Sequence, residues 1–203
     1  MGNFNNNNGT NSSLINYLSK VSVLSVSTVV TVIMFYLVMF VLNPNIDSSD
    51  GFSVIKLQLA FDQTVGLNII NSWGSDGVAY FLDWIYLDYI YAASYSLFFS
   101  SLLAYLLRKK CYYLDPRLNL IVFVPFFAGF LDCLENTMEV FFLRSPNEFI
   151  NEVFWFHSMV AAVKWMMLPL ILLCAIYIST FGLTNKDTCR AADTSIRLLD
   201  KPE

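Results

Sequence analysis

Four long apolar segments constrain this chain more than any other feature of its sequence. They cover residues 21–42, 81–107, 118–143 and 154–182, and each has at least the roughly 20 residues that a helix needs to span the hydrocarbon core of a bilayer. A transmembrane β-barrel would instead need alternating segments of about ten residues, whereas these segments are continuous. The sequence therefore predicts an all-α, polytopic membrane protein built as a bundle of four transmembrane helices.

The composition supports this fold class and excludes others. Hydrophobic residues make up 56% of the 203 residues and charged residues only 14%, which is too apolar for an ordinary soluble domain. The first apolar segment exceeds the usual apolar core of about 7–15 residues in a signal peptide and lacks a small-residue cleavage site. With a net charge of −4 and no basic stripe that could follow phosphates, we expect no nucleic-acid partner.

Three regions are expected along the chain. Residues 1–19 are rich in asparagine and are predicted to be a disordered leader; residues 20–182 form the transmembrane domain, and residues 183–203 form a polar tail. The longest connection, residues 44–80, mixes apolar and polar positions at helical spacing. It predicts one or two amphipathic helices that rest on the membrane or cap the bundle, followed by a turn near Gly74.

Basic residues predict the orientation, because Lys and Arg are retained on the cytosolic side of short loops. If the N-terminus is cytosolic, nine basic residues face the cytosol and only Lys56 and Arg144 face the other side. The nine are Lys20, Arg108, Lys109, Lys110, Arg117, Lys186, Arg190, Arg197 and Lys201. We therefore expect both termini in the cytosol and residues 44–80 outside it.

Ionisable and polar residues recur at helical spacing inside three of the predicted spans. In the third span four of them occupy positions i, i+3, i+4 and i+7, so they share one helical face. From a rise of 1.5 Å per residue, the polar groups of the three spans fall at similar depths, about 10–16 Å below the outer boundary. The candidate site residues are Asp88, Tyr91 and Tyr95 in the second span, Asp132, Glu135, Asn136 and Glu139 in the third, and His157 and Lys164 in the fourth.

The acids in this set outnumber the bases. An isolated charge at this depth costs on the order of 3 kcal/mol even on the biological insertion scale, so each must pair, protonate or face water. Since Lys164 neutralises only one carboxylate, at least one acid is predicted to be protonated or to meet a cation. The single histidine excludes multi-histidine zinc sites, and the four cysteines contain no C-x-x-C pair. We expect no cofactor and no metal.

Part of the chain resembles a group of small four-span membrane proteins. The resemblance covers residues 57–164 and is most specific in the stretch from Leu87-Asp88 to Tyr95 and in the D-x-x-E-N formed by Asp132, Glu135 and Asn136. It implies the four-span fold and these residues as a signature, and it brings no activity with it. A more distant architectural similarity is to emopamil-binding and sterol-isomerase-like bundles, in which buried acids meet a sterol or an amine.

Several functional interpretations remain open from the sequence. The favoured one is a lipid- or amphiphile-binding bundle, with Asp132 and Glu135 as an acid–base pair if it is an enzyme. A second is a structural or assembly subunit whose charges pair with a partner membrane subunit. A third is a component of a proton- or cation-coupled transporter. A purely structural alternative is that Lys164, Asp132, Asn136 and the tyrosines form a hydrogen-bonded clasp that fixes the helix register.

Overall fold

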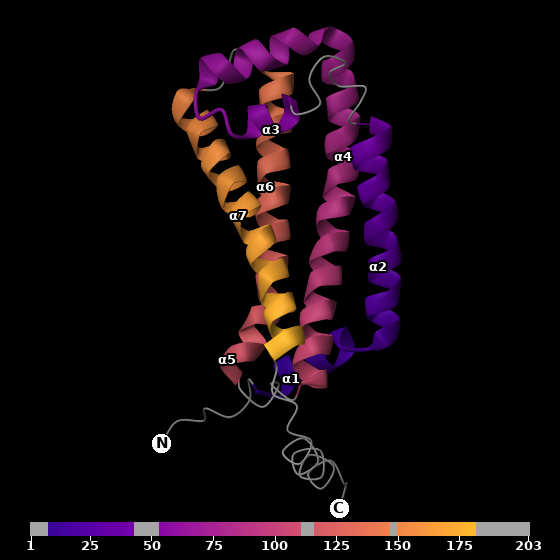
Figure 1. The fold of residues 1–203 in the computed structure, drawn as a ribbon. Coiled ribbons are helices and arrows are strands. Elements are labelled where there is room, and N and C mark those ends of the chain that lie inside the picture. The colour runs from indigo at the N-terminus through magenta and orange to yellow at the C-terminus, as the bar shows by residue number, and fades with distance from the viewer. Residues whose placement is uncertain (1–7, 43–52, 111–115, 147–149, 182–203) are drawn as a thin grey trace, which may run out of the picture.

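The computed structural model describes residues 8–42, 53–110, 116–146 and 150–181, and they form an almost wholly helical bundle (Figure 1). Four helical segments in this part of the chain are long and apolar enough to cross a membrane: Val21–Val41, Gln63–Lys109, Leu120–Arg144 and Asn151–Thr180. The predicted fold class is confirmed. The elements are α1 (Asn8–Leu18), α2 (Val21–Tyr36), the π-helix η1 (Leu37–Leu42), α3 (Ser53–Gln58), α4 (Gln63–Lys109), α5 (Pro116–Asn119), the 3₁₀-helix η4 (Leu120–Phe123), α6 (Val124–Arg144) and α7 (Asn151–Phe181).

Helix α4 is divided into two arms by a sharp bend at Gly74. This residue has φ 64° and ψ −174°, a backbone conformation that only glycine adopts readily. The first arm, residues 63–73, lies across one end of the bundle, and the second, residues 75–109, runs along it (Figure 1). At 1.5 Å per residue the second arm is about 50 Å long and exceeds the roughly 30 Å hydrocarbon core. The turn expected near Gly74 is therefore confirmed.

Helix α3 and the first arm of α4 together form a cap over the ends of α6 and α7. The backbone N–H of Phe61, between these two helices, donates to Oγ of Ser158 at 3.1 Å, and that of Gln63 donates to Oδ1 of Asn151 at 3.0 Å. Gly66 lies so close to the ring of Phe154 that a Cβ atom there would collide with it. Of the two predicted arrangements, resting on the membrane or capping the bundle, the structure shows that the amphipathic segment caps the bundle.

The long arm of α4 is the central element of the bundle, because it packs against α2, α6 and α7. It lies close to α6 at Gly129, where a Cβ atom would collide with Oγ of Ser96 and lie 3.1 Å from the carbonyl oxygen of Ala92. Small residues at such a crossing allow two backbones to approach closely in a membrane. This contact fixes the face that α6 presents to α4.

Two apolar clusters form the core. One lies near the cap and includes Phe81, Ile85, Phe142 and Phe154, and the other lies toward the opposite end and includes Leu103, Leu107, Val122, Ala128, Ile171 and Ala175. On each of α4, α6 and α7, the predicted site residues fall between the segments that supply these two clusters, except that Tyr95 belongs to the second cluster. The site is therefore enclosed by apolar packing along the bundle axis.

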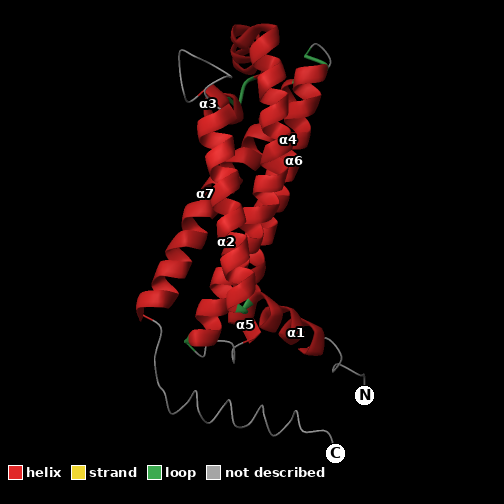
Figure 2. Ribbon diagram, turned by 90° about the vertical axis from the view of Figure 1, so that its right-hand side faces the viewer, coloured by secondary structure: helices red, strands yellow, loops and turns green. Residues whose placement is uncertain are grey.

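The prediction of a disordered leader over residues 1–19 is wrong for its second half. Residues 8–18 form α1, which Figure 2 shows across the end of the bundle near α5. Ile15 and Leu18 are buried in the second apolar cluster, and Nη1 of Arg108 donates to Oδ1 of Asn16 at 3.2 Å. The asparagine-rich composition concealed these two apolar residues, which share a helical face. Residues 1–7 and the predicted tail, 183–203, lie outside the described part of the chain.

Candidate functional site

The structure brings the predicted site residues together in one buried polar cluster between α4, α6 and α7. Tyr91 is half-buried, and none of the other eight exposes more than 4% of its surface. Because the four acids lie on membrane-spanning helices and are shielded from solvent, each needs a partner inside the protein. Their partners divide the cluster into three groups.

The first group is centred on Lys164 of α7. Its Nζ atom lies 2.8 Å from Oδ1 of Asp132 and 2.7 Å from Oε2 of Glu135, both on α6. The hydroxyl of Tyr95 donates to the other oxygen of Asp132, Oδ2, at 3.0 Å. One ammonium thus joins two carboxylates one helical turn apart, and a third helix contributes a neutral donor.

The second group consists of Asp88 on α4 and Asn136 on α6. The amide Nδ2 of Asn136 donates to Oδ2 of Asp88 at 2.9 Å. Among the described residues, Asp88 forms no ion pair, since the ion pairs of the cluster join Lys164 and His157 to other acids. Asp88 is therefore held by a neutral hydrogen bond, and among the described residues no cationic side chain is in direct contact with it.

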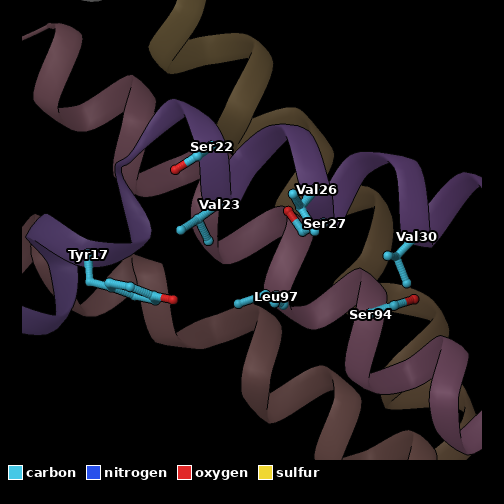
Figure 3. Close-up of a pocket in the computed structure, with 8 residues that line it drawn as sticks. All are labelled: Tyr17, Ser22, Val23, Val26, Ser27, Val30, Ser94 and Leu97. Carbon is cyan, nitrogen blue, oxygen red and sulfur yellow. The ribbon is translucent and has the colours of Figure 1, made fainter.

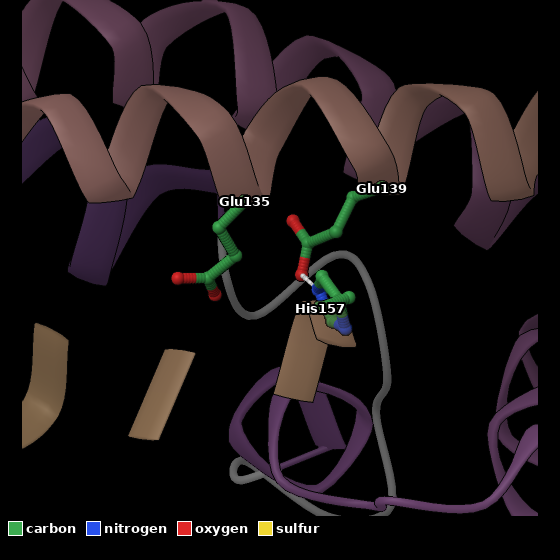
Figure 4. A group of neighbouring side chains, drawn as sticks. All are labelled: Glu135, Glu139 and His157. Carbon is green, nitrogen blue, oxygen red and sulfur yellow. Dashed lines mark ion pairs between the residues drawn. The ribbon is translucent and has the colours of Figure 1, made fainter. Parts of the chain in front are cut away.

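The third group contains Glu135 and Glu139 of α6 and His157 of α7, and Figure 4 shows Glu139 and His157 turned toward each other with Glu135 beside them. The Nε2 atom of His157 lies 3.4 Å from Oε1 of Glu139, and one ligand atom from each of the three residues falls within 4.8 Å of the others. Within the described part of the chain, neither ring nitrogen of His157 nor Oε1 of Glu135 makes a hydrogen bond. These three side chains are the ones in the cluster that could hold a metal ion.

Aromatic rings enclose the third group toward the cap. The ring of His157 lies 5.2 Å from that of Phe142, edge-on, and 5.5 Å from that of Phe154. The two phenylalanine rings shield the imidazole from water. Neither ring supplies a conventional acceptor for a hydrogen bond from the imidazole. The group combines a dry surrounding with polar atoms that lack partners, which is uncommon in a folded protein.

One buried polar residue near this group was not predicted. Gln58 of α3 exposes 1% of its surface, its Oε1 atom accepts from Nε1 of Trp165 at 3.0 Å, and its side chain also lies against Glu139. Its position in the predicted extracytosolic loop gave no reason to place it inside the bundle. The amphipathic pattern of that loop is the only sequence signal that could have suggested it.

A separate groove opens between α1, α2 and α4 (Figure 3). It has a volume of about 360 Å³, and its lining surface is mainly apolar. Four of the lining residues are apolar, Val23, Val26, Val30 and Leu97, and four carry hydroxyls, Tyr17, Ser22, Ser27 and Ser94. The groove was not predicted from the sequence. Its lining suits a hydrocarbon chain better than a charged ligand.

The absence of a metal was expected because the sequence contains a single histidine and no C-x-x-C pair. A mixed group of two carboxylates and one imidazole is not evident from sequence spacing, because Glu135 and Glu139 on one helix approach His157 only after α6 and α7 pack.

Comparisons with protein-family models, with curated proteins and with solved structures gave no match for this chain.

Proposed function

We propose that this multi-pass membrane protein binds a cationic amphiphile, with the positive headgroup at Asp88 and the hydrocarbon chain in the groove between α2 and α4. The observation that carries the proposal is the state of Asp88, a buried carboxylate with an amide partner and no ion pair among the described residues. A buried carboxylate that lacks a cation is costly unless a ligand supplies one.

A row of side chains along α4 connects the groove to Asp88. Ser94 lines the groove, and Tyr91 and Asp88 follow at three-residue intervals, which places each beside the next on the helix surface. The distance from Ser94 to Asp88 along the helix axis is about 9 Å. A single amphiphile is long enough to occupy both ends of this row.

Tyr91 is the residue that would control whether a ligand in the groove reaches Asp88. Its ring is half-buried and lies 6.3 Å from that of Phe35 on α2 and 5.3 Å from that of Tyr95. The neighbouring first span is the least buried of the four, since 17% of its apolar window is buried in the bundle. A rotation of Tyr91 toward α2 would open Asp88 to the groove, and its ring face would attract a cation.

The same geometry gives less support to the other interpretations. An assembly subunit would present charges outward to a partner helix, whereas the acids and Lys164 point into the bundle. A transport path would need polar groups toward the other end, where the apolar cluster around Leu103, Leu107 and Ile171 fills the interior. An enzymatic role for Asp132 and Glu135 would require a substrate beside Lys164, and the groove does not reach that position.

The proposal is tested by binding a long-chain primary alkylamine, such as hexadecylamine, to the purified protein in lipid nanodiscs. Asp88→Asn keeps the shape of the side chain and removes its charge, and Asp83→Asn makes the same change at an exposed position five residues earlier on α4. We expect Asp88→Asn to weaken binding at least tenfold and Asp83→Asn to change it less than twofold. Equal weakening by both variants would point to a nonspecific effect of membrane charge.

A further inference from the structure

We infer that Glu135, Glu139 and His157 form a site for one divalent transition-metal ion of the Zn²⁺ type, buried beneath the cap. The inference goes beyond the proposed amphiphile binding and concerns a different group of the cluster, in which Asp88 and Tyr91 take no part. Two observations support it: the geometry of the ligand atoms, and the absence of a hydrogen bond to either ring nitrogen of the imidazole among the described residues.

The ligand atoms are close to the arrangement that one ion requires. Two ligands at about 2.1 Å from a tetrahedral ion lie about 3.4 Å apart. The Nε2 atom of His157 and Oε1 of Glu139 are already at 3.4 Å, and the full set lies within 4.8 Å. Glu135 is four residues before Glu139 on α6, so both carboxylates project from one face, and a rotamer adjustment of Glu135 would complete the set.

The imidazole is buried without the hydrogen bonds that usually accompany such burial. His157 is fully buried, and neither of its ring nitrogens makes a hydrogen bond among the described residues. A buried imidazole without hydrogen bonds costs free energy, and binding an ion through Nε2 would compensate that cost. The burial of Oε1 of Glu135, which also makes no hydrogen bond in that part of the chain, has the same explanation.

The charges of the cluster balance when such an ion is present. Lys164 offsets Asp132, which it contacts at 2.8 Å, and a divalent ion would offset Glu135 and Glu139. The remaining carboxylate is Asp88, the residue assigned above to a cationic headgroup. Imidazole and carboxylate together favour Zn²⁺, Mn²⁺ or Fe²⁺ over Ca²⁺ and Mg²⁺, which prefer oxygen ligands alone.

Neighbouring residues would orient the ligands. Gln58 lies against Glu139 and is fixed by Trp165, whose Nε1 donates to its Oε1 atom at 3.0 Å. Lys164 contacts Oε2 of Glu135 at 2.7 Å and leaves Oε1 for the ion. Such outer contacts hold metal ligands in position and typically change affinity 10–100-fold when they are removed. Three protein ligands would leave one position on the ion for water or another small ligand.

The test is a titration of the purified, EDTA-treated full chain with Zn²⁺ alone, followed by metal analysis after gel filtration. We expect about one zinc per chain, a raised melting temperature, and a loss of affinity of at least tenfold in Glu139→Gln and in His157→Asn. Glu152→Gln, an exposed glutamate near the start of α7, is the matched control and should change the affinity less than twofold.

A second measurement keeps the test decisive if a variant does not fold. Co²⁺ bound to the unmodified chain should give visible absorption bands of a tetrahedral or five-coordinate site, and zinc should remove them. Zinc that does not stabilise the unmodified chain, or binds equally to all folded variants, would overturn the inference. Because hexadecylamine binding is a separate readout, its persistence in that case would leave the proposed function standing.

Discussion

The Nε2 atom of His157 lies 3.4 Å from Oε1 of Glu139, and neither side chain exposes any surface to solvent. The two residues come from different membrane-spanning helices, α7 and α6, and aromatic rings surround the imidazole on the cap side. A carboxylate and an imidazole in this position are expected to destabilise the bundle when no ion is bound, because both are shielded from water and make no hydrogen bond among the described residues.

Replacement of Glu139 by glutamine should therefore have opposite effects with and without metal. In EDTA, Glu139→Gln removes a buried charge and is expected to raise the free energy of unfolding by about 1 kcal/mol or leave it unchanged. With Zn²⁺ in excess, the unmodified chain should become the more stable of the two. Thermal unfolding in detergent under both conditions measures the difference, and a variant that is less stable than the unmodified chain in EDTA would contradict this account.

Lys164 should be essential for stability because it joins two buried carboxylates. Lys164→Met leaves Asp132 and Glu135 without their ammonium and is expected to cost about 3–5 kcal/mol in the free energy of unfolding. Lys56→Met, which makes the same change at an exposed position of α3, should cost at most about 1 kcal/mol. Denaturation in mixed micelles provides the comparison.

The loss should be recovered in part when the acids are neutralised together with the lysine. The triple variant Lys164→Met, Asp132→Asn, Glu135→Gln contains no buried charge at this group and is expected to be more stable than Lys164→Met alone. If the triple variant were less stable than the single one, direct charge pairing would not be the main role of Lys164.

The close contact at Gly129 should be sensitive to a single methyl group. Gly129→Ala places a Cβ atom against Oγ of Ser96, and overpacking of this kind is expected to cost about 1–3 kcal/mol. Ser96→Ala removes that oxygen, so the double variant should recover part of the loss; the recovery is incomplete because the carbonyl oxygen of Ala92 remains 3.1 Å away. Additive effects of the two substitutions in unfolding measurements would show that the helices separate elsewhere.

The proposed orientation can be checked with glycosylation acceptors in the chain. Asn8-Gly9-Thr10 and Asn11-Ser12-Ser13 match the acceptor pattern, and they should stay unmodified in microsomal membranes if the N-terminus is cytosolic. Asp47→Thr completes an acceptor at Asn45 in the connection between the first two spans, and this position should be modified. A shift in electrophoretic mobility, reversed by a glycosidase, distinguishes the outcomes; modification of the N-terminal acceptors alone would reverse the orientation.

The four spans and the members of the polar cluster were predictable because each gives a strong local signal. An acid or a lysine inside an apolar segment of 20 residues is conspicuous, and spacing of three, four and seven residues shows which positions share a face. The partners within the cluster were not predictable. That Lys164 meets Asp132 and Glu135 rather than Asp88 depends on the rotation of each helix about its axis, which contacts such as Gly129 with Ser96 determine.

Two elements were misjudged or missed for a different reason. Helix α1 was hidden by the asparagine-rich composition, although Ile15 and Leu18 are enough to dock it against α4. Gln58 was missed because the bend at Gly74 folds the cap back over α6 and α7, and a local pattern does not reveal where a distant segment returns. In both cases tertiary packing, rather than local propensity, decided the outcome.

The central claim is that Asp88 binds the headgroup of a cationic amphiphile, and mass spectrometry of molecules retained by the purified protein tests it most directly. The unmodified chain, Asp88→Asn and Asp83→Asn would be purified from the same membranes in parallel. The account predicts an amine-containing amphiphile that is retained by the unmodified chain and by Asp83→Asn and is lost from Asp88→Asn. Retention of the same molecules by all three proteins, or of none by the unmodified chain, would contradict it.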